Sequence, residues 1–235
     1  MEYYKRRKNK KPIDYEEKYW GTINDPDGNV RIRLKERDRY MRNNRTEIDY
    51  VKENCKGKIL DIGCGLGYFL SAFPDYLKFE KHGVELSEYA SKEARKYGDI
   101  QNTLYYPRHY FDVVTMFHVI EHIDKPENTI KQIRKILKDG GTLIIATPDF
   151  DSGCARQFGE NYRLLNDDTH VSLFTNESMF RFLRDYGFII NKVDYPFFNT
   201  EYFTEENMLR MFDADKVSPP FYGNYMTFYC TKGEI

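Results

Sequence analysis

The sequence predicts an α/β fold in which a mostly parallel sheet carries helices on both faces. Between residues 58 and 147, short apolar runs alternate with helical patterns, which is the order expected of βαβ units. The first apolar run leads directly into a glycine-rich turn at residues 63–67. The 235 residues suffice for one hydrophobic core with additional segments around it.

The first twelve residues are expected to form a flexible basic tail. They combine few apolar side chains with a cluster of positive charges, a composition typical of solvated segments. The basic residues are Lys5, Arg6, Arg7, Lys8, Lys10 and Lys11. Residues 13–235 are predicted to form a single domain.

Two parts of this domain are predicted to cap a binding site. The first, residues 13–54, contains Tyr15 and Tyr19, whose spacing of four places them on one helix face, and a charged helical stretch over 33–54. The second, residues 195–224, is too long and polar for a tight turn between two strands.

The predicted sheet begins with a buried strand over residues 58–63. A helix over 68–73 follows the glycine-rich turn, then come a strand over 81–85, a helix over 87–97 and a strand over 111–117. Gly98 provides the stop signal of the second helix.

The later elements continue the same alternation. Pro126 suits the first turn of a helix whose apolar residues recur at helical spacing, and Gly140 with Gly141 is expected to end it. A strand over 142–147 comes next. A helix over 175–186 and two strands, 188–193 and 225–231, complete the chain.

The composition argues against several classes of function. The 36 Lys and Arg residues balance 37 Asp and Glu residues, and the net charge of −1 makes a nucleic-acid partner unlikely. No apolar stretch approaches the roughly 20 residues that span a bilayer, and no apolar run follows the initial charges, so a cytoplasmic protein without a membrane partner is expected. The four cysteines form no close pair, which argues against a zinc knuckle or a CxxC redox site.

The glycine-rich turn carries the main functional signal. Gly63, Gly65 and Gly67 follow Asp61 in a G-x-G-x-G spacing, and Tyr68 stands where a dinucleotide fingerprint needs its third glycine. Glycines let a ligand approach the backbone closely, and a helix N-terminus beyond them favours a carboxylate. An acidic residue beside the loop suits a ligand that bears an ammonium group.

A second acidic residue defines the ligand further. Glu85 ends the second strand, where a carboxylate can accept hydrogen bonds from both hydroxyls of a ribose. S-adenosylmethionine (SAM) combines a ribose, a carboxylate and an ammonium group. The sequence therefore predicts a SAM site at this edge of the sheet.

Several motifs in the expected order resemble the class I SAM-dependent methyltransferases, in particular the small-molecule subgroup of ubiquinone-pathway and sugar methyltransferases. The motifs are residues 59–67, 83–87, 111–114, 118–122 and 137–148, within a resembling stretch of about 57–190. The resemblance implies a Rossmann-like seven-stranded sheet with an antiparallel last strand, and S-adenosylhomocysteine (SAH) as product. It assigns cofactor binding to Tyr19, Asp61, Gly63, Cys64, Gly65, Glu85, Leu86, Phe117 and His118.

One departure from the family pattern concerns the adenine. The family places an acidic residue in a loop after its third strand, whereas residues 98–102 are compressed here. Asp99 and Asn102 are both candidates for this contact.

Residues 118–122 also match the H-x-x-E-H pattern of a class of zinc metalloproteases. That site requires a helix with both histidines and a third ligand downstream, whereas this segment leaves a strand. No metal is expected, and His122 is assigned a capping or packing role.

Two histidines are candidates for the base that removes a proton from a hydroxyl acceptor. His170, the first candidate, lies in a polar loop and resembles an H-x-x-x-F element of the sugar and ubiquinone-type enzymes; the alternative is that it only fixes this loop. His118 leaves the strand at the carboxyl end of the sheet and is the second candidate.

These observations predict methyl transfer from SAM to a small-molecule acceptor, expected to be a hydroxyl of a sugar or a phosphorylated metabolite. Two alternatives remain: an RNA-modifying methyltransferase that uses the basic tail, and a non-catalytic SAM-binding partner protein. The sequence leaves the oligomeric state open.

Overall fold

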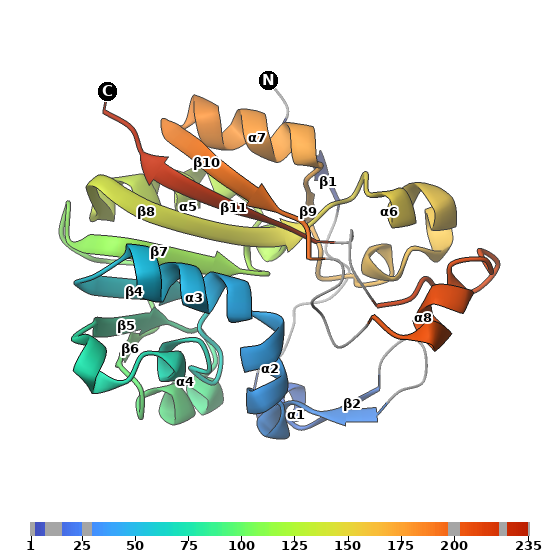
Figure 1. The fold of residues 1–235 in the computed structure, drawn as a ribbon, viewed down its shortest axis with the longest axis horizontal. Coiled ribbons are helices and arrows are strands. Elements are labelled where there is room, and N and C mark those ends of the chain that lie inside the picture. Colours follow the sequence, from blue (N-terminus) through green and yellow to red (C-terminus); the bar gives the residue numbers. More distant parts are fainter. Residues whose placement is uncertain (1–2, 8–15, 25–29, 197–202, 221–224, 235) are drawn as a thin grey trace.

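The computed structural model describes residues 3–7, 16–24, 30–196, 203–220 and 225–234. Its centre is a seven-stranded sheet in the order β10-β11-β8-β7-β4-β5-β6, in which only β11 runs antiparallel to its neighbours (Figure 1). The predicted α/β class and the antiparallel last strand are therefore confirmed. The strands are β4 (Lys58–Ile62), β5 (Glu80–Val84), β6 (Asp99–Gln101), β7 (Phe111–Phe117), β8 (Leu137–Pro148), β10 (Phe188–Asp194) and β11 (Tyr225–Lys232).

Helices cover both faces of this sheet. The amphipathic helices α5 (Pro126–Ile136) and α7 (Asn176–Asp185) bury apolar residues in one core, which includes Leu60, Val114 and Phe228 of the strands. On the other face, α3 (Arg45–Asn54) and α4 (Glu88–Ala94) pack on a second core with Ile59 and Tyr229. The alternation of strand residues between the two cores follows from the period of two in a β-strand.

The strand order fixes where a ligand can bind. From β4 the chain continues to β5 on one side and, later, to β7 on the other side, so the connections diverge at the β4–β7 pair. In open parallel sheets, ligands bind at the carboxyl ends of the strands at such a point. Residues 63–65, 85 and 118 all directly follow these strand ends.

Several predicted helix boundaries are wrong. The helix expected over 68–73 is a single 3₁₀ turn, η2 (Leu70–Ala72), because Pro74 forces the preceding residue into extended backbone, and Phe73 has φ −110° and ψ 90°. The helix that starts at Pro126 ends before Gly140, because Leu137 already pairs with Phe111 as the first residue of β8.

The predicted helix over 33–54 is also interrupted. It consists of η1 (Arg33–Lys35), α2 (Arg37–Asn43) and α3, and Asn44 separates the last two. The break changes the direction of the chain, so α2 leaves the sheet and lies beside the carboxyl ends of the strands (Figure 1).

The first described residues are docked rather than free, which corrects the expectation of a flexible tail for residues 3–7. In β1 (Lys5–Arg6), Lys5 and Arg6 pair with β9 (Ser172–Leu173), as is visible beside α7 in Figure 1. Tyr4 is buried, its ring lies 5.1 Å from that of Phe174, and its hydroxyl donates to Glu127. Residues 8–12 of the predicted tail lie outside the described residues.

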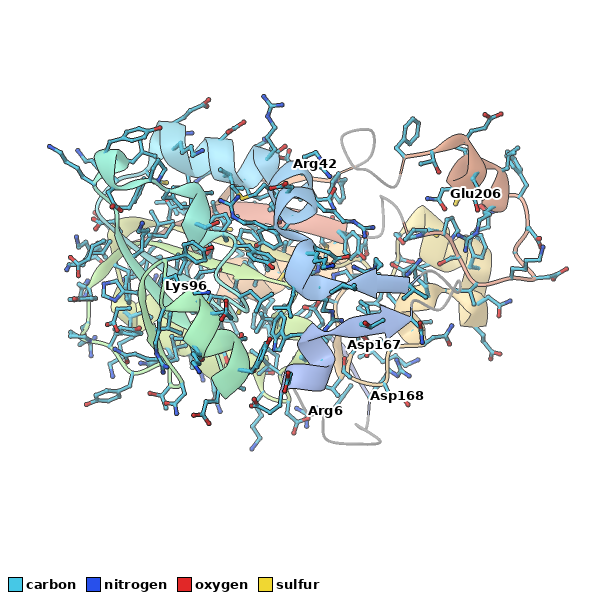
Figure 2. All side chains as sticks on the ribbon, turned by 90° about the horizontal axis from the view of Figure 1, so that it is seen from below. Arg6, Arg42, Lys96, Asp167, Asp168 and Glu206 are labelled. Carbon is cyan, nitrogen blue, oxygen red and sulfur yellow. The ribbon has the colours of Figure 1, made fainter. Side chains whose placement is uncertain are left out.

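The basic side chains of this docked segment have partners on the body of the protein. Arg6 donates to the Asp124 carbonyl, and Arg7 donates to the Leu165 carbonyl and lies 3.9 Å from Asp168. Figure 2 labels Arg6 on this segment and Asp167 and Asp168 on the loop before β9. These contacts hold the segment against the domain.

The N-terminal cap consists of α1 (Glu17–Trp20) and a hairpin of β2 (Thr22–Asn24) and β3 (Val30–Ile32). A second lobe combines α6 (Gly153–Phe158) with the segment around α8 (Glu205–Arg210), where Phe158 and Tyr162 pack against Met211. The sequence did not predict α6 or α8. Tyr15 and residues 197–202 and 221–224 of the predicted caps lie outside the described residues. Among the helices described, none has the length and apolar composition needed to cross a membrane.

Candidate functional site

A cavity of about 380 Å³ opens at the carboxyl ends of the central strands, between the glycine-rich turn and the N-terminal cap. We call it the edge cavity. Its lining combines residues that the sequence singled out with residues of the cap. It comprises Trp20, Arg31, Arg33, Glu36, Arg39, Tyr40, Asn43, Asn44, Glu47, Asp61, Gly63, Cys64, Gly65, Leu66, Tyr68, Phe117, His118, Ala146, Pro196, Tyr225 and Thr227.

The glycine-rich turn forms the floor of the edge cavity. The amides of Gly63 and Cys64 both donate to the Val84 carbonyl, which fastens the turn to the end of β5. Gly63 and Gly65 have φ values of +70° and +53°, a region that favours glycine. The turn therefore exposes backbone to the cavity.

Glu85 holds the turn from the other side. Its side chain is buried, its Oε2 accepts from the Gly65 amide at 2.8 Å, and its Oε1 accepts from the Ser87 amide at 2.8 Å. An ionised carboxylate offers about four acceptor positions, so each oxygen keeps one for a further donor. Glu85 can therefore hold the turn in place and also accept hydrogen bonds from the hydroxyl groups of a ligand.

Asp61 is a buried carboxyl group in the cavity wall. It accepts a hydrogen bond from the Thr115 hydroxyl at 2.7 Å. Burial raises the pKa of Asp61 to about 7; the hydrogen bond from Thr115 opposes this shift, and the charge of Glu85 adds to it. A cation beside Asp61 would stabilise the ionised form, so the position favours an ammonium group.

Trp20 of the cap covers the turn. A Cβ atom added at Gly65 would lie 2.8 Å from Cη2 of Trp20, and the indole Nε1 donates to the Ser87 hydroxyl at 3.2 Å. Glu16 accepts from the amides of Glu88 and Tyr89 and so attaches the cap to the start of α4. The sequence predicted Tyr19 as the aromatic cap residue. The Tyr19 ring instead contacts Arg33, whose guanidinium carbon lies 3.6 Å from the ring centroid.

The other predicted cofactor residues divide into two groups. Cys64, Phe117 and His118 line the edge cavity. Tyr19, Glu85 and Leu86 are not part of the described lining; Glu85 is buried beside the Gly65 amide, and Leu86 is 73% exposed. Sequence position alone does not separate these groups, because adjacent residues after a strand point in different directions.

The two adenine candidates lie at opposite ends of β6. Asp99 begins the strand, is exposed, and lies 3.6 Å from Nδ1 of His82. Asn102 directly follows β6 at the carboxyl edge of the sheet. Glu85 follows the neighbouring parallel strand β5 at the same edge. The topology therefore favours Asn102 over Asp99.

His118 lines the edge cavity and also lies close to the buried Glu121. It has φ +55°, an uncommon value for a residue other than glycine, which turns the chain sharply at the end of β7. Its ring lies 4.8 Å from that of Tyr225, and its Nδ1 lies 3.6 Å from Oε1 of Glu121. His118 is thus in reach of a molecule in the cavity.

His170 lies deeper and is not part of the described cavity lining. Its Nδ1 is 2.7 Å from the Leu164 carbonyl, and its ring is 4.9 Å from that of His122. Burial lowers the pKa of His170, although the charges of Glu121 and Asp167 oppose the shift. The imidazole is therefore neutral near pH 7, which suits a base or a ligand atom.

Glu121 is the buried carboxylate of this group. Its burial raises the pKa, but His118, His122 and His170 outweigh that effect and hold the pKa below its ordinary value. Glu121 is therefore ionised near neutral pH. The sequence singled out Glu121 and His122 only as part of a zinc pattern, and His170, 48 positions beyond His122, completes the cluster in space.

The cap also supplies residues that the sequence analysis missed. Arg31, Arg33 and Arg39 bring basic groups to the cavity, where Glu36 pairs with Arg31 at 2.7 Å and with Arg39 at 3.1 Å. A polar stripe with helical spacing at Glu36, Tyr40, Asn43 and Glu47 is the signal that could have identified this wall.

The residues at the turn fit the cofactor that the resemblance implies. Gly63 is exposed and lines the cavity, the buried Glu85 keeps acceptor positions for ribose hydroxyls, and the buried Asp61 favours an ammonium group. These three features match the chemical groups of SAM. No comparable match exists for a dinucleotide, since Tyr68 lines the cavity where the third glycine would stand.

Comparison with known proteins identifies the family. A family model for a methyltransferase domain matches residues 33–193. A ubiquinone biosynthesis O-methyltransferase of Proteus mirabilis is 29% identical over 121 residues, which are 44% of this chain and 49% of that protein. The alignment thus spans about half the length of that relative. An uncharacterised protein of Methanocaldococcus jannaschii is 27% identical over 150 residues, 61% of this chain and 71% of that protein.

Solved structures share the fold. A SAM-dependent methyltransferase from Archaeoglobus fulgidus superposes with a TM-score of 0.61 at 21% identity, over 83% of this chain and 94% of that chain. The matched family model covers the sheet and most of its helices. The chain therefore belongs to the class I SAM-dependent methyltransferases.

Proposed function

We propose that this methyltransferase acts on a small molecule, at a hydroxyl group of a sugar or a phosphorylated metabolite. The observation that supports this most directly is the composition of the edge cavity. It places His118, a group able to accept a proton, in one wall and the guanidinium groups of Arg31, Arg33 and Arg39 in another. Guanidinium groups suit phosphate and carboxylate oxygens.

We assign cofactor binding to residues that surround the glycine-rich turn. Glu85 accepts the ribose hydroxyls, Asp61 faces the ammonium group, and the backbone of residues 63–65 approaches the ligand. Phe117 and His118 lie at the cavity side of the sheet edge. The contacts of Tyr19, Glu85 and Leu86 with the cofactor stay predictions, since none of the three belongs to the described lining.

When bound, SAM supplies a methyl group on a sulfonium, which becomes a neutral thioether after transfer. The protein aligns an acceptor and removes the hydroxyl proton. His118 has direct access to the cavity and is the stronger candidate for receiving that proton on its imidazole. His170, the first candidate from the sequence, is placed to act through its neighbours or through a ligand held between them.

The RNA-modifying alternative depended on a free basic tail. Lys5 and Arg6 are part of a paired strand, and Arg6 and Arg7 make contacts within the domain. This part of the tail is therefore less suited to phosphate binding than a free segment. The non-catalytic alternative requires a protein that binds SAM and transfers no methyl group to any acceptor.

A screen with methyl-labelled SAM distinguishes these functions. We expect label to move from SAM to one or a few small molecules when the protein is incubated with a fractionated mixture of anionic metabolites and with total RNA. His118→Ala is expected to lower this transfer by about a hundredfold or more, since general base catalysis contributes that much, without a comparable change in SAH affinity. Label in RNA alone would favour the RNA-modifying function, and SAH binding without any labelled product would favour the non-catalytic one.

The raised pKa of Asp61 predicts a pH-dependent affinity for the cofactor product. Because the carboxyl group has a pKa of about 7 in the free protein and SAH favours its ionised form, binding should release a proton. We expect the affinity for SAH to rise roughly fivefold to tenfold from pH 6 to pH 7.5, as the ionised fraction grows. Isothermal titration calorimetry in a pH series measures this directly.

Two variants test the origin of this pH dependence. Asp61→Asn should bind SAH more weakly at pH 7.5 and show a nearly flat profile. Thr115→Val removes the hydrogen bond that lowers the pKa of Asp61, so the rise in affinity should move to higher pH. A wild-type slope that persists in Asp61→Asn would show that another group is responsible.

A further inference from the structure

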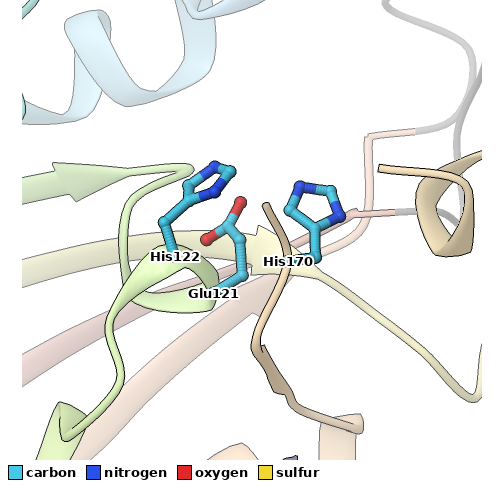
Figure 3. Close-up of side chains that lie close together, drawn as sticks. All are labelled: Glu121, His122 and His170. Carbon is cyan, nitrogen blue, oxygen red and sulfur yellow. The ribbon is translucent and has the colours of Figure 1, made fainter. Parts of the chain in front are cut away.

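The buried Glu121 and His170 and the half-buried His122 form a cluster beside the edge cavity (Figure 3). Glu121 and His122 belong to the 3₁₀ turn η4 (Ile120–His122) after β7, and His170 comes from the loop before β9. One ligand atom of each side chain lies within 4.8 Å of those of the other two. Two elements distant in sequence therefore present two imidazoles and one carboxylate to a common point.

The hydrogen bonds of the two histidines determine which nitrogen is available. Nδ1 of His170 lies 2.7 Å from the Leu164 carbonyl. Nδ1 of His122 lies 3.1 Å from the Thr169 carbonyl and 2.9 Å from the Thr169 hydroxyl, which donates its own proton to Asp167. A carbonyl oxygen can only accept, so each Nδ1 carries the proton and each neutral ring has its lone pair on Nε2. A backbone carbonyl that orients a histidine in this way is the usual outer support of a metal ligand.

Glu121 contributes an oxygen that needs a partner. Its Oε2 accepts from the Thr147 hydroxyl at 3.1 Å. Its Oε1 is buried and has no hydrogen-bond partner among the described residues, and Nδ1 of His118 lies 3.6 Å away, beyond hydrogen-bond distance. A buried carboxyl oxygen without a partner is costly, and a bound cation would remove that cost.

We propose that Glu121, His122 and His170 bind a divalent transition-metal ion. Two imidazole nitrogens and one carboxylate oxygen form a ligand set that suits ions such as Zn²⁺, Mn²⁺ or Co²⁺ and leaves positions open for other ligands. Ligand atoms around such an ion stand about 3–4 Å apart at bond lengths of about 2.0–2.2 Å. Binding therefore requires the three side chains to move inward by about 1 Å or less.

The sequence pattern could not supply this site. The zinc-protease interpretation of residues 118–122 needs both histidines as ligands on one helix, whereas His118 lines the edge cavity and the segment forms a 3₁₀ turn. The third ligand is His170, which lies near His122 only after folding. Asp167, with Oδ2 3.8 Å from Nε2 of His170, is close enough to become an additional ligand.

The role of the ion rests on the proposed transfer to a hydroxyl group. His118 links the cluster to the cavity: it belongs to the cavity lining, and its Nδ1 lies 3.6 Å from Oε1 of Glu121. An ion held by the cluster, with positions open toward His118, would act as a Lewis acid on the acceptor oxygen and lower the pKa of its hydroxyl, whose proton would pass to the His118 imidazole. An oxygen lone pair would then form the bond to the methyl carbon while the carbon–sulfur bond of SAM breaks and its electron pair stays on the sulfur of SAH.

The experiment uses Co²⁺ alone as probe, with the full-length chain prepared without a histidine tag and treated with a chelator. We expect one Co²⁺ per chain, visible as d–d absorption bands, and displacement of these bands by Zn²⁺. His170→Ala and Glu121→Gln should each weaken Co²⁺ binding by at least tenfold. His109→Asn is the matched control, since it removes a histidine outside the cluster at a position with φ +52°, where asparagine is tolerated.

SAH affinity and thermal unfolding of the metal-free proteins accompany each titration. A variant that binds SAH normally but has lost Co²⁺ supports the site, because its fold is intact. His122→Asn provides a second, less buried substitution if His170→Ala unfolds. Absence of Co²⁺ binding above the level of nonspecific sites, or equal binding in wild type and the cluster variants, would overturn the proposal. Failure of SAH to bind would instead contradict the cofactor assignment, whatever the Co²⁺ result.

Discussion

Replacement of Glu85 by alanine is expected to weaken SAH binding by at least a hundredfold. The proposed contacts with two ribose hydroxyls are hydrogen bonds to a charged group, each worth about 1.5–3 kcal/mol. The substitution also leaves the amides of Gly65 and Ser87 without the carboxylate that accepts from them. Both effects act on the same ligand, because the Gly65 amide belongs to the floor of the edge cavity.

Calorimetry with SAH measures this effect, and Glu88→Ala is its control. Glu88 is an exposed acidic residue three positions away, so its replacement changes the net charge equally without touching the turn. We expect its SAH affinity to stay within about twofold of wild type, since exposed charges contribute little. If Glu85→Ala retained a cooperative unfolding transition and bound SAH as tightly as wild type, the assignment of Glu85 to the ribose would be wrong.

The sequence predicted the sheet better than its surroundings because a buried strand is a local signal. Residues 111–117 were expected as a strand and form β7 with the same bounds. This strand can be predicted from its own apolar residues alone, because both faces of a central parallel strand are buried. The glycine-rich turn and Glu85 were identifiable for a related reason: their function depends on spacing from the strand ends.

Features that depend on contacts between distant residues were not predictable in this way. Tyr4 looks like part of a solvated tail until β9, more than 160 positions later, provides a strand for Lys5 and Arg6. The choice of Trp20 rather than Tyr19 as the cover of the turn depends on the angle at which α1 meets α4. Similarly, the sequence identified His170 as a candidate base. That His170 lies beside Glu121 and His122 depends on the path of the loop before β9, which the sequence does not specify.

Replacement of Gly63 by alanine is expected to destabilise the protein by about 3 kcal/mol or more and to weaken SAH binding. Gly63 has φ +70°, which costs other residues about 1–2 kcal/mol. The added Cβ would also lie 2.3 Å from Cγ2 of Val119, and the stiff, branched valine side chain has few alternative rotamers. Overpacking of this kind costs about 1–3 kcal/mol.

Other glycines of the chain separate these two contributions. Gly140 also has a positive φ, +71°, but a Cβ there meets nothing within 4 Å, so Gly140→Ala should show the strain alone. Gly153, at the start of α6, has neither problem, and Gly153→Ala should be neutral or slightly stabilising. Urea unfolding of the three variants should therefore rank Gly63→Ala lowest, Gly140→Ala next and Gly153→Ala highest in free energy of unfolding.

A double-mutant cycle identifies the clash. Val119→Ala removes the methyl group that a Cβ at Gly63 would meet, so Gly63→Ala should cost less in the Val119→Ala background, with a coupling of about 1–3 kcal/mol. The strain from the positive φ remains in both backgrounds. Additive effects of the two substitutions would show that the turn shifts to admit the side chain. In that case Gly63 is required for its backbone conformation rather than for close packing against Val119, and the SAH affinity of the double variant should equal that of Gly63→Ala.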